Sequence, residues 1–137
     1  MSSITKMGEV EVKMIVSLEK IHYAIIGAFE GGSTYWLRKA ELQSSENPRT
    51  DFKVVWWGDI NIFSGKYTFK VCYDDPKLEE GNGKGKMIVT QDAVAKGLEE
   101  MAKHNPYQFG LLLSDQDDAT THDVFMQFVI LGEEVYS

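Results

Sequence analysis

Two acidic residues lie where a carboxylate could take part in catalysis. Glu30 stands at the C-terminal end of a predicted helix, where the helix dipole disfavours a negative charge by about 0.3–1 kcal/mol. Asp123 lies beside the start of the last apolar helix. Two carboxylates in one cleft can serve as general acid and general base if folding brings them together. A small enzyme using Glu30 and Asp123 is therefore one alternative, and a structural hydrogen-bond partner for each acid is the other.

The residues after Glu30 have the composition of a binding site. Gly31 and Gly32 permit a ligand to approach the backbone, and Tyr35 and Trp36 follow at once. An exposed aromatic ring stacks on a base with about 1–3 kcal/mol. The simpler interpretation is that the two glycines end the helix in the left-handed conformation. In that case Glu30 accepts a hydrogen bond from a backbone N–H or from the Trp36 indole.

Further candidates come from a tryptophan pair and the last helix. Trp56 and Trp57 are adjacent in a predicted strand, so one of them faces away from the core and needs a dimer interface or a ligand to cover it. Gln127 lies among apolar residues, so its amide needs partners; Asp123 lies four residues earlier on the same helical face. A closed internal network is the alternative to a ligand. The candidate binding residues are Glu30, Gly31, Gly32, Tyr35, Trp36, Trp57, Asp123 and Gln127.

The sequence predicts neither a metal site nor a cofactor. The cluster Asp115-x-Asp117-Asp118 lacks the glycine and the terminal bidentate glutamate of a calcium loop. The three histidines have no metal-ligand spacing, and a single cysteine, Cys72, excludes an intramolecular disulfide and a cysteine-cluster zinc site. We expect Cys72 to be a packing residue in a reducing cytoplasm.

Composition limits the class of partner. The chain of 137 residues, 43% of them hydrophobic, predicts a single domain over residues 1–137. A net charge of −7 with only two arginines argues against duplex nucleic acid as a partner. No run approaches the roughly 18 apolar residues of a membrane span, so we expect no membrane partner.

The elements that must position these residues follow from periodicity and capping. Period-two alternation predicts strands over 10–16, 52–63, 67–73 and 87–89, with a hairpin turn at 64–66. Helical spacing predicts helices over 18–29, 33–42, 91–103, 107–113 and 124–133. Ser17, Ser33 and Thr90 are predicted N-caps, and Thr120-x-x-Asp123 is predicted to form a capping box. The order predicts an α+β fold, an antiparallel sheet of about four strands with helices packed on one face.

Two motifs at the ends of the chain resemble a family of small uncharacterised proteins encoded by bacteriophages and prophages. The family pattern is Glu-Gly-Gly-Ser/Ile-Asn-Tyr-Trp, followed much later by an Asp-rich turn, a helix with Asp and Gln, and Gly-Glu-x-Val-Tyr. The matching residues are Ala28–Trp36, Asp118–Asp123, Gln127 and Gly132–Tyr136. Thr34 stands where Asn is usual, and Ser137 where Gly is.

The resemblance implies a phage origin and expression in the cytoplasm of an infected bacterium. It brings no activity with it. By analogy with other small accessory phage proteins, it suggests a non-enzymatic inhibitor of a bacterial defence system. Such an inhibitor would sequester a nucleotide-like signal or bind a host protein. We expect the inhibitor to be a homo-oligomer. A phage accessory protein that acts only through self-association is a further alternative.

Overall fold

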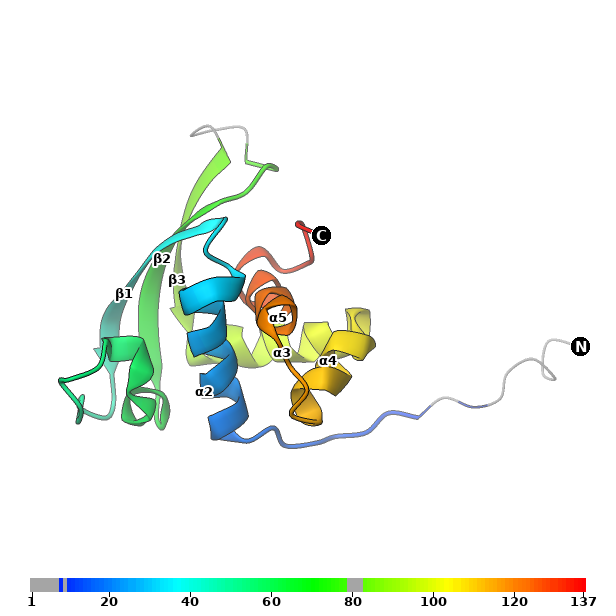
Figure 1. Ribbon diagram of the computed structural model, residues 1–137, viewed down its shortest axis with the longest axis horizontal. Coiled ribbons are helices and arrows are strands. Elements are labelled where there is room, and N and C mark those ends of the chain that lie inside the picture. The colour runs from blue at the N-terminus through cyan, green and yellow to red at the C-terminus, as the bar shows by residue number, and fades with distance from the viewer. Residues whose placement is uncertain (1–7, 9, 79–82) are drawn as a thin grey trace, which may run out of the picture.

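The fold is a three-stranded antiparallel sheet with helices packed on one face (Figure 1). The computed structural model describes residues 8, 10–78 and 83–137. The strands are β1 (Leu37–Ser45), β2 (Tyr67–Asp74) and β3 (Lys84–Thr90), and the helices are α2 (Leu18–Gly27), α3 (Gln91–His104), α4 (Pro106–Leu113) and α5 (Ala119–Leu131). The predicted α+β class is confirmed, with three strands among the described residues instead of about four.

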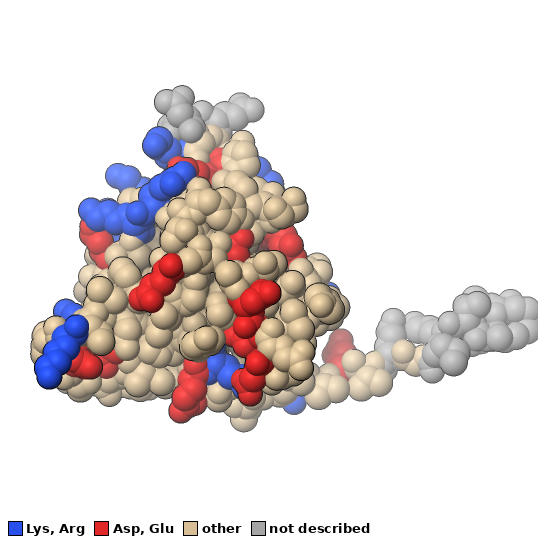
Figure 2. Space-filling model, in the orientation of Figure 1, with Lys and Arg blue, Asp and Glu red and all other residues tan. Residues whose placement is uncertain are grey.

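The central strand, β2, has one apolar and one polar face. Phe69 and Val71 point into the core, whereas Thr68, Lys70 and Cys72 alternate with them on the outward side. β2 pairs antiparallel with β1 on one side and with β3 on the other. Figure 2 shows basic side chains gathered on the sheet side of the molecule, in its upper left, while acidic groups are spread over the surface.

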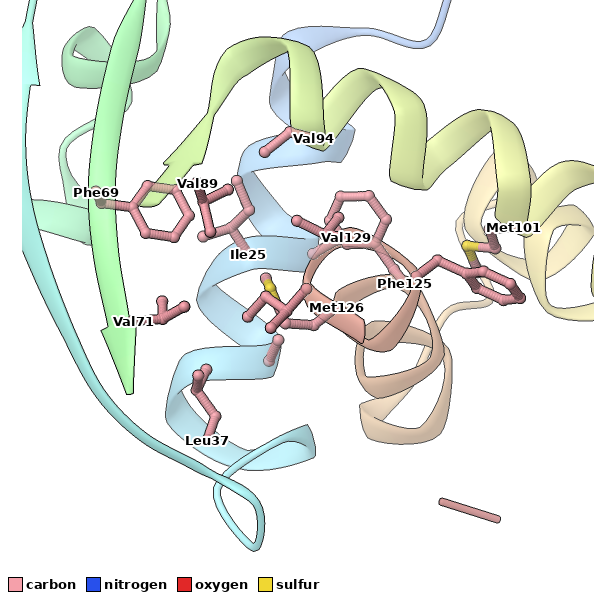
Figure 3. Close-up of a cluster of buried hydrophobic side chains, with 14 of the residues drawn as sticks. Ile25, Leu37, Phe69, Val71, Val89, Val94, Met101, Phe125, Met126 and Val129 are labelled. Atoms are coloured by element: carbon pink, nitrogen blue, oxygen red, sulfur yellow. The ribbon is translucent and has the colours of Figure 1, made fainter. Parts of the chain in front are cut away.

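Helix α5 is the centre of the fold, and every residue from 121 to 130 is buried. In Figure 3, Phe125, Met126 and Val129 of α5 lie among side chains from the sheet and from helices α2 and α3. The predicted caps of α2 and α3 are confirmed: Ser17 Oγ accepts the Lys20 N–H at 3.3 Å, and Thr90 Oγ1 accepts the Ala93 N–H at 3.1 Å. These two helices could be predicted because the apolar stripe and the N-cap of each lie in its own stretch of sequence.

The predicted helix over 33–42 is wrong, since β1 occupies Leu37–Ser45. This segment contains good helix formers, but from Leu37 onward its backbone pairs with β2, with register shifts between Leu37 and Lys39 and between Leu42 and Ser44. Its inward positions Ala40 and Leu42 then lie beside Val71 and Phe69. Tertiary pairing and burial override the local helical preference.

The predicted strands over 10–16 and 52–63 are also wrong. Residues 10–17 form no regular element, and Val10 and Ile15 are 83% and 98% exposed. The second segment forms two short 3₁₀ turns, Trp56–Gly58 and Ile60–Phe63. Turn 64–66 does lead into β2, but the hairpin partner of β2 is not the segment before that turn.

Two predicted helix ends differ in detail. Helix α5 begins earlier than predicted, at Ala119, with Asp118 as N-cap; the capping box joins Asp118 to Thr121, in place of Thr120 to Asp123. At the other end of the chain, α2 continues into a π-helical turn, Ala28–Gly32, without a left-handed glycine. None of the helices in the described ranges combines the length and apolarity that crossing a membrane requires.

Candidate functional site

Asp123 is a buried carboxylate that accepts four hydrogen bonds. Its Oδ1 accepts from Ser33 Oγ at 2.8 Å and from Trp36 Nε1 at 2.7 Å. Its Oδ2 accepts from Tyr35 OH at 2.6 Å and from Gln127 Nε2 at 3.1 Å. Burying an isolated charge is costly unless it is hydrogen-bonded, and four donors offset that cost here. Asp123 therefore ties the segment after α2 to helix α5.

Gln127 extends this network to the C-terminal residues. Its Oε1 accepts the backbone N–H groups of Val135 and Tyr136 at 2.8 and 2.9 Å, and its Nε2 also donates to the Tyr136 carbonyl at 3.2 Å. The Tyr136 ring stacks on Trp36 with centroids 5.9 Å apart. The partners that the buried amide was predicted to need are therefore internal. We call Ser33, Tyr35, Trp36, Asp123, Gln127 and Tyr136 the Asp123 network.

Gly32 has a packing role beside this network. A Cβ at Gly32 would lie 2.4 Å from the Ala119 carbonyl oxygen and 3.2 Å from the Asp123 nitrogen. The π-helical turn can therefore lie against the first turn of α5 only without a side chain at this position. A Cβ at Gly31 would meet nothing within 4 Å, so Gly31 faces open space.

Glu30 lies apart from the Asp123 network. Its exposed carboxylate accepts a hydrogen bond from Trp57 Nε1 at 2.8 Å, whereas the suggested donor, the Trp36 indole, bonds to Asp123. The Trp57 and Phe29 rings meet edge to face with centroids 5.5 Å apart. Glu30 thus joins the end of α2 to the connection between β1 and β2.

The structure does not unite the eight candidate residues in one cleft. Tyr35, Trp36, Asp123 and Gln127 share the Asp123 network, and Glu30 pairs separately with Trp57. Among the described residues, the two carboxylates Glu30 and Asp123 have no hydrogen-bond donor in common. The geometry gives no support to an acid–base pair made of these two residues.

Tyr35 is the point where the Asp123 network reaches the surface. Its ring is 49% exposed, while its hydroxyl donates to Asp123. Partial burial, and then the hydrogen bond to the carboxylate, raise the pKa of the Tyr35 hydroxyl above its usual value. The phenol therefore stays protonated at neutral pH and keeps its hydrogen bond.

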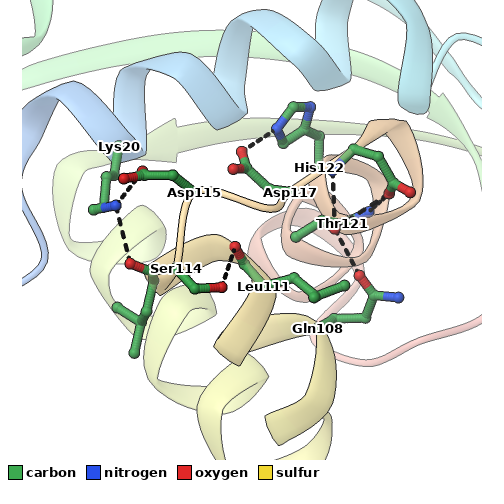
Figure 4. A network of polar contacts seen from close by, with 10 residues as sticks. Lys20, Gln108, Leu111, Ser114, Asp115, Asp117, Thr121 and His122 are labelled. Atoms are coloured by element: carbon green, nitrogen blue, oxygen red, sulfur yellow. Dashed lines mark hydrogen bonds and ion pairs between the residues drawn. The ribbon is translucent and has the colours of Figure 1, made fainter.

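A buried histidine–aspartate pair was not predicted. His122 Nε2 lies 2.6 Å from Asp117 Oδ2, and both side chains are buried (Figure 4). Asp117 precedes α5 and His122 lies in its first turns, a spacing that carries no metal or catalytic signature in the sequence. The other ring nitrogen, Nδ1, faces Gly27, where a Cβ would approach to 1.9 Å. The ring is thus wedged between α2 and α5.

The acidic cluster before α5 is divided among separate partners. Asp115 pairs with Lys20, which also donates to the Leu113 carbonyl at 3.1 Å, while Asp117 meets His122 (Figure 4). Asp118 caps α5, and the Thr121 N–H that it accepts lowers the pKa of its carboxyl. Within the described ranges, no three His, Cys, Asp or Glu side chains are grouped so as to hold a metal ion.

Comparison with known proteins adds no homologue. No protein-family model, curated protein or solved structure matches the chain.

Proposed function

We propose that the protein is a phage-encoded, non-enzymatic binding protein that inhibits a bacterial defence system in the host cytoplasm by covering a surface of a host protein. The observation that supports this is a set of exposed apolar side chains on the connection between β1 and β2. Phe52, Val54, Val55 and Ile60 are 75%, 36%, 48% and 38% exposed. We call these four residues the apolar segment. The four residues lie within nine positions of the chain, and contiguous exposed apolar groups are typical of protein interaction sites.

The connection that carries the apolar segment is held by hydrogen bonds. Asp59 is buried, and its carboxylate accepts the N–H groups of Asp51, Thr50 and Asn61 at 3.0, 2.6 and 3.1 Å. These hydrogen bonds, that of Asp51 first, lower the pKa of the Asp59 carboxyl. The same side chain explains why the segment turns where a strand was predicted.

Aromatic packing anchors the same connection to the core. Trp56 stacks on buried Phe63 with centroids 6.1 Å apart, and Trp57 donates to Glu30. A rigid surface loses little conformational entropy when it binds a partner, which favours affinity. In this proposal, Glu30 and Trp57 position the apolar segment for the host protein.

The signal-sequestering alternative has weaker support. Two open grooves in the described residues have volumes of about 410 Å³ each. One includes Glu46, Asp92 and a single cation, Lys66; the other includes Lys20 with Glu19, Asp115 and Asp117. A nucleotide-like signal carries phosphates, and these carboxylates would repel them. The protein-binding branch fits the surface better.

Self-association is a second candidate, favoured by a separate observation. Val10, Val12, Met14 and Ile15 precede α2 in an irregular segment, and their exposed fractions run from 53% to 98%. A second copy of the chain would cover these side chains. A homo-oligomer is compatible with binding a host protein through the apolar segment.

The proposed function can be tested by plating phage on bacteria that carry individual defence systems and express this chain. We expect the wild-type chain to restore plating against at least one system. Phe52→Asp with Val55→Asp should abolish the rescue, because two charges cannot enter an apolar interface. Tyr107→Asp, at a ring 72% exposed on α4, is the matched control and should retain it.

Two results would contradict the proposal. One is the absence of rescue against every system in a broad panel, and the other is full rescue by the Phe52/Val55 variant. Thermal melts of all variants must coincide for the comparison to hold. Calorimetry with cyclic nucleotides tests the alternative, since heat of binding to any of them would support signal sequestration.

A further inference from the structure

The outward face of the sheet is built from rows of residues that the strand register places side by side. One row is Lys39, Cys72 and Lys86, and the next is Glu41, Lys70 and Ile88. The inward-facing neighbours are core residues such as Val71 and Val89, which the helices cover. In the described part of the chain, no element packs over the outward rows, and Lys39, Lys86 and Ile88 are exposed.

This face is basic on an acidic molecule. Arg38, Lys39, Lys70, Lys84 and Lys86 supply five positive charges, while Glu41 and Asp74 supply two negative ones. The face thus carries a net +3, whereas the whole chain has a net charge of −7. Figure 2 shows the corresponding gathering of basic side chains on the sheet side.

Two of the cations are paired within the face. Lys39 Nζ lies 2.6 Å from Glu41, and Arg38 Nε donates to Asp74 at 2.7 Å. These exposed pairs are weak and can exchange partners at little cost. Lys70 and Lys86 lie in neighbouring rows. Ile88, which is 49% exposed, lies beside Lys70 in the same row. The result is a positive surface with one exposed apolar side chain on its β3 edge.

We propose that the outward face of the sheet is a docking surface for an acidic segment of the host protein. Charge complementarity argues for this partner, because a surface of net +3 steers and orients an acidic one. A nucleic acid strand fits less well. The outward rows contain no aromatic ring on which a base could stack.

This inference deepens the proposed function, because it assumes that the partner is a protein. It adds the chemistry of that partner, which the apolar segment does not specify. The outward face is formed by β1, β2 and β3, whereas the apolar segment lies on the connection between β1 and β2. The two surfaces can therefore be altered independently.

The test is fluorescence anisotropy with a fluorescein-labelled glutamate-rich peptide at low salt. The face variant is Lys39→Glu, Lys70→Glu and Lys86→Glu. The matched control is Lys66→Glu, Lys96→Glu and Lys103→Glu, which changes the net charge equally at exposed lysines outside the face. We expect the face variant to bind about tenfold more weakly than the control variant, and high salt to abolish wild-type binding.

If the reversed charges prevent folding, a neutral variant replaces the glutamate variant: Lys39→Gln, Lys70→Gln and Lys86→Gln. This variant should also bind the peptide more weakly than its glutamine-substituted control. Equal losses in the face and control variants would overturn the proposal, and so would the absence of wild-type binding. Tighter binding of a labelled single-stranded oligonucleotide, lost in the face variant, would assign the face to nucleic acid. If the face variant alone differs from the wild type in molar mass, the outward face is instead a contact between two copies of the chain.

The peptide assay and the plating assay fail independently. Intact peptide discrimination without any phage rescue would contradict the proposed function and leave the acidic-ligand surface in place. Rescue by the wild-type chain without discrimination between face and control variants would contradict only the docking surface.

Discussion

The Asp123 carboxylate joins segments that are far apart in the chain. Ser33, Tyr35 and Trp36 reach it from one end, and Gln127 connects it to Tyr136 at the other. Several residues of the two motifs therefore lie together in one hydrogen-bonded network, whereas Glu30 of the first motif bonds to Trp57 outside it. Their chemistry is used for holding the fold, and the surface that we propose for binding lies elsewhere.

Replacing Asp123 should test this role directly. We expect Asp123→Asn to lower the free energy of unfolding by about 2–3 kcal/mol, since a neutral amide accepts fewer and weaker hydrogen bonds from the four donors. Urea unfolding followed by circular dichroism measures the change. Asp92→Asn, at an exposed position in the first turn of α3, is the control. A variant as stable as the control would show that the network contributes little.

We expect the folded chain to lose stability at alkaline pH, because several tyrosine hydroxyls have a raised pKa in the folded state. Burial raises the pKa of Tyr35, Tyr67, Tyr73 and Tyr136 in the folded chain. In the unfolded chain the pKa of a tyrosine hydroxyl is about 10. Because the pKa is higher in the folded chain, these protonated hydroxyls contribute their full stabilisation below about pH 10, and this contribution is lost as the pH rises further. The free energy of unfolding should therefore be flat from neutral pH to about 9 and then fall.

Tyr35→Phe isolates one of these contributions. Because this variant has one phenol fewer to ionise on unfolding, its stability should decline less steeply above pH 10 than that of the wild type. Unfolding by urea across an alkaline pH series gives the slope. Tyr107→Phe, at an exposed ring, should keep the wild-type slope, and equal slopes in all three proteins would refute the interpretation.

Part of the residue-level chemistry could be predicted from the sequence. The need of the Gln127 amide for hydrogen-bond partners followed from its apolar neighbours, and the helical spacing placed Asp123 on the same face. Whether those partners were internal or a ligand did not follow from the sequence. The identity of the tryptophan partners could not be predicted, because Trp36 and Trp57 both follow Glu30 and only the tertiary arrangement decides between them. The His122–Asp117 pair could not be predicted either, because the conformation of the turn before α5 decides whether the two side chains meet.

At the scale of elements, glycines set how closely the helices approach α5. A Cβ at Gly97 of α3 would lie 2.5 Å from Val129 Cγ2 and 2.7 Å from Val129 Cα. Gly27 and Gly32 allow similar contacts with His122 and Ala119. Three segments therefore pack against α5 at distances that a side chain would prevent. These contacts explain how a helix buried on nearly all sides fits into a small fold.

Two glycine-to-alanine substitutions in helices should have opposite effects. Gly97→Ala should destabilise the chain by about 1–3 kcal/mol, because the Val129 backbone cannot move away from the added methyl group. Gly110→Ala in α4 meets nothing within 4 Å and should stabilise it by up to about 1 kcal/mol through helical preference. Thermal and urea unfolding measure both. Destabilisation by Gly110→Ala, or none by Gly97→Ala, would contradict the packing argument.

Elements with a local signal were predictable, and elements that depend on distant partners were not. The cap and apolar stripe of α3 are both contained in its own sequence. Strand β1 has the composition of a helix and becomes a strand only because β2 pairs with it. The segment around Trp56 alternates like a strand, but the hydrogen bonds accepted by Asp59 bend it into turns.

At the scale of the molecule, the sheet has one face in the core and one face that is basic and open. The α+β class followed from the order of the predicted elements, since a short antiparallel sheet with several helices has few ways to bury its apolar face. The expected strand over 10–16 pairs with no strand among the described residues. An alternating apolar segment that stays exposed predicts an interaction with another chain.

The last prediction is that residues 10–16 mediate self-association. Val10, Val12 and Met14 alternate with charged residues, as in a strand, and a neighbouring copy could cover them at the free edge of β1 or β3. Light scattering should give the full chain a mass above that of the monomer. A chain that starts at Ser17, which retains the cap of α2, should be monomeric, and so should the full chain with Val12→Asp and Ile15→Asp. Lys53→Asp, at an exposed position outside the segment, should keep the higher mass. Identical masses for the full and shortened chains would refute self-association through this segment.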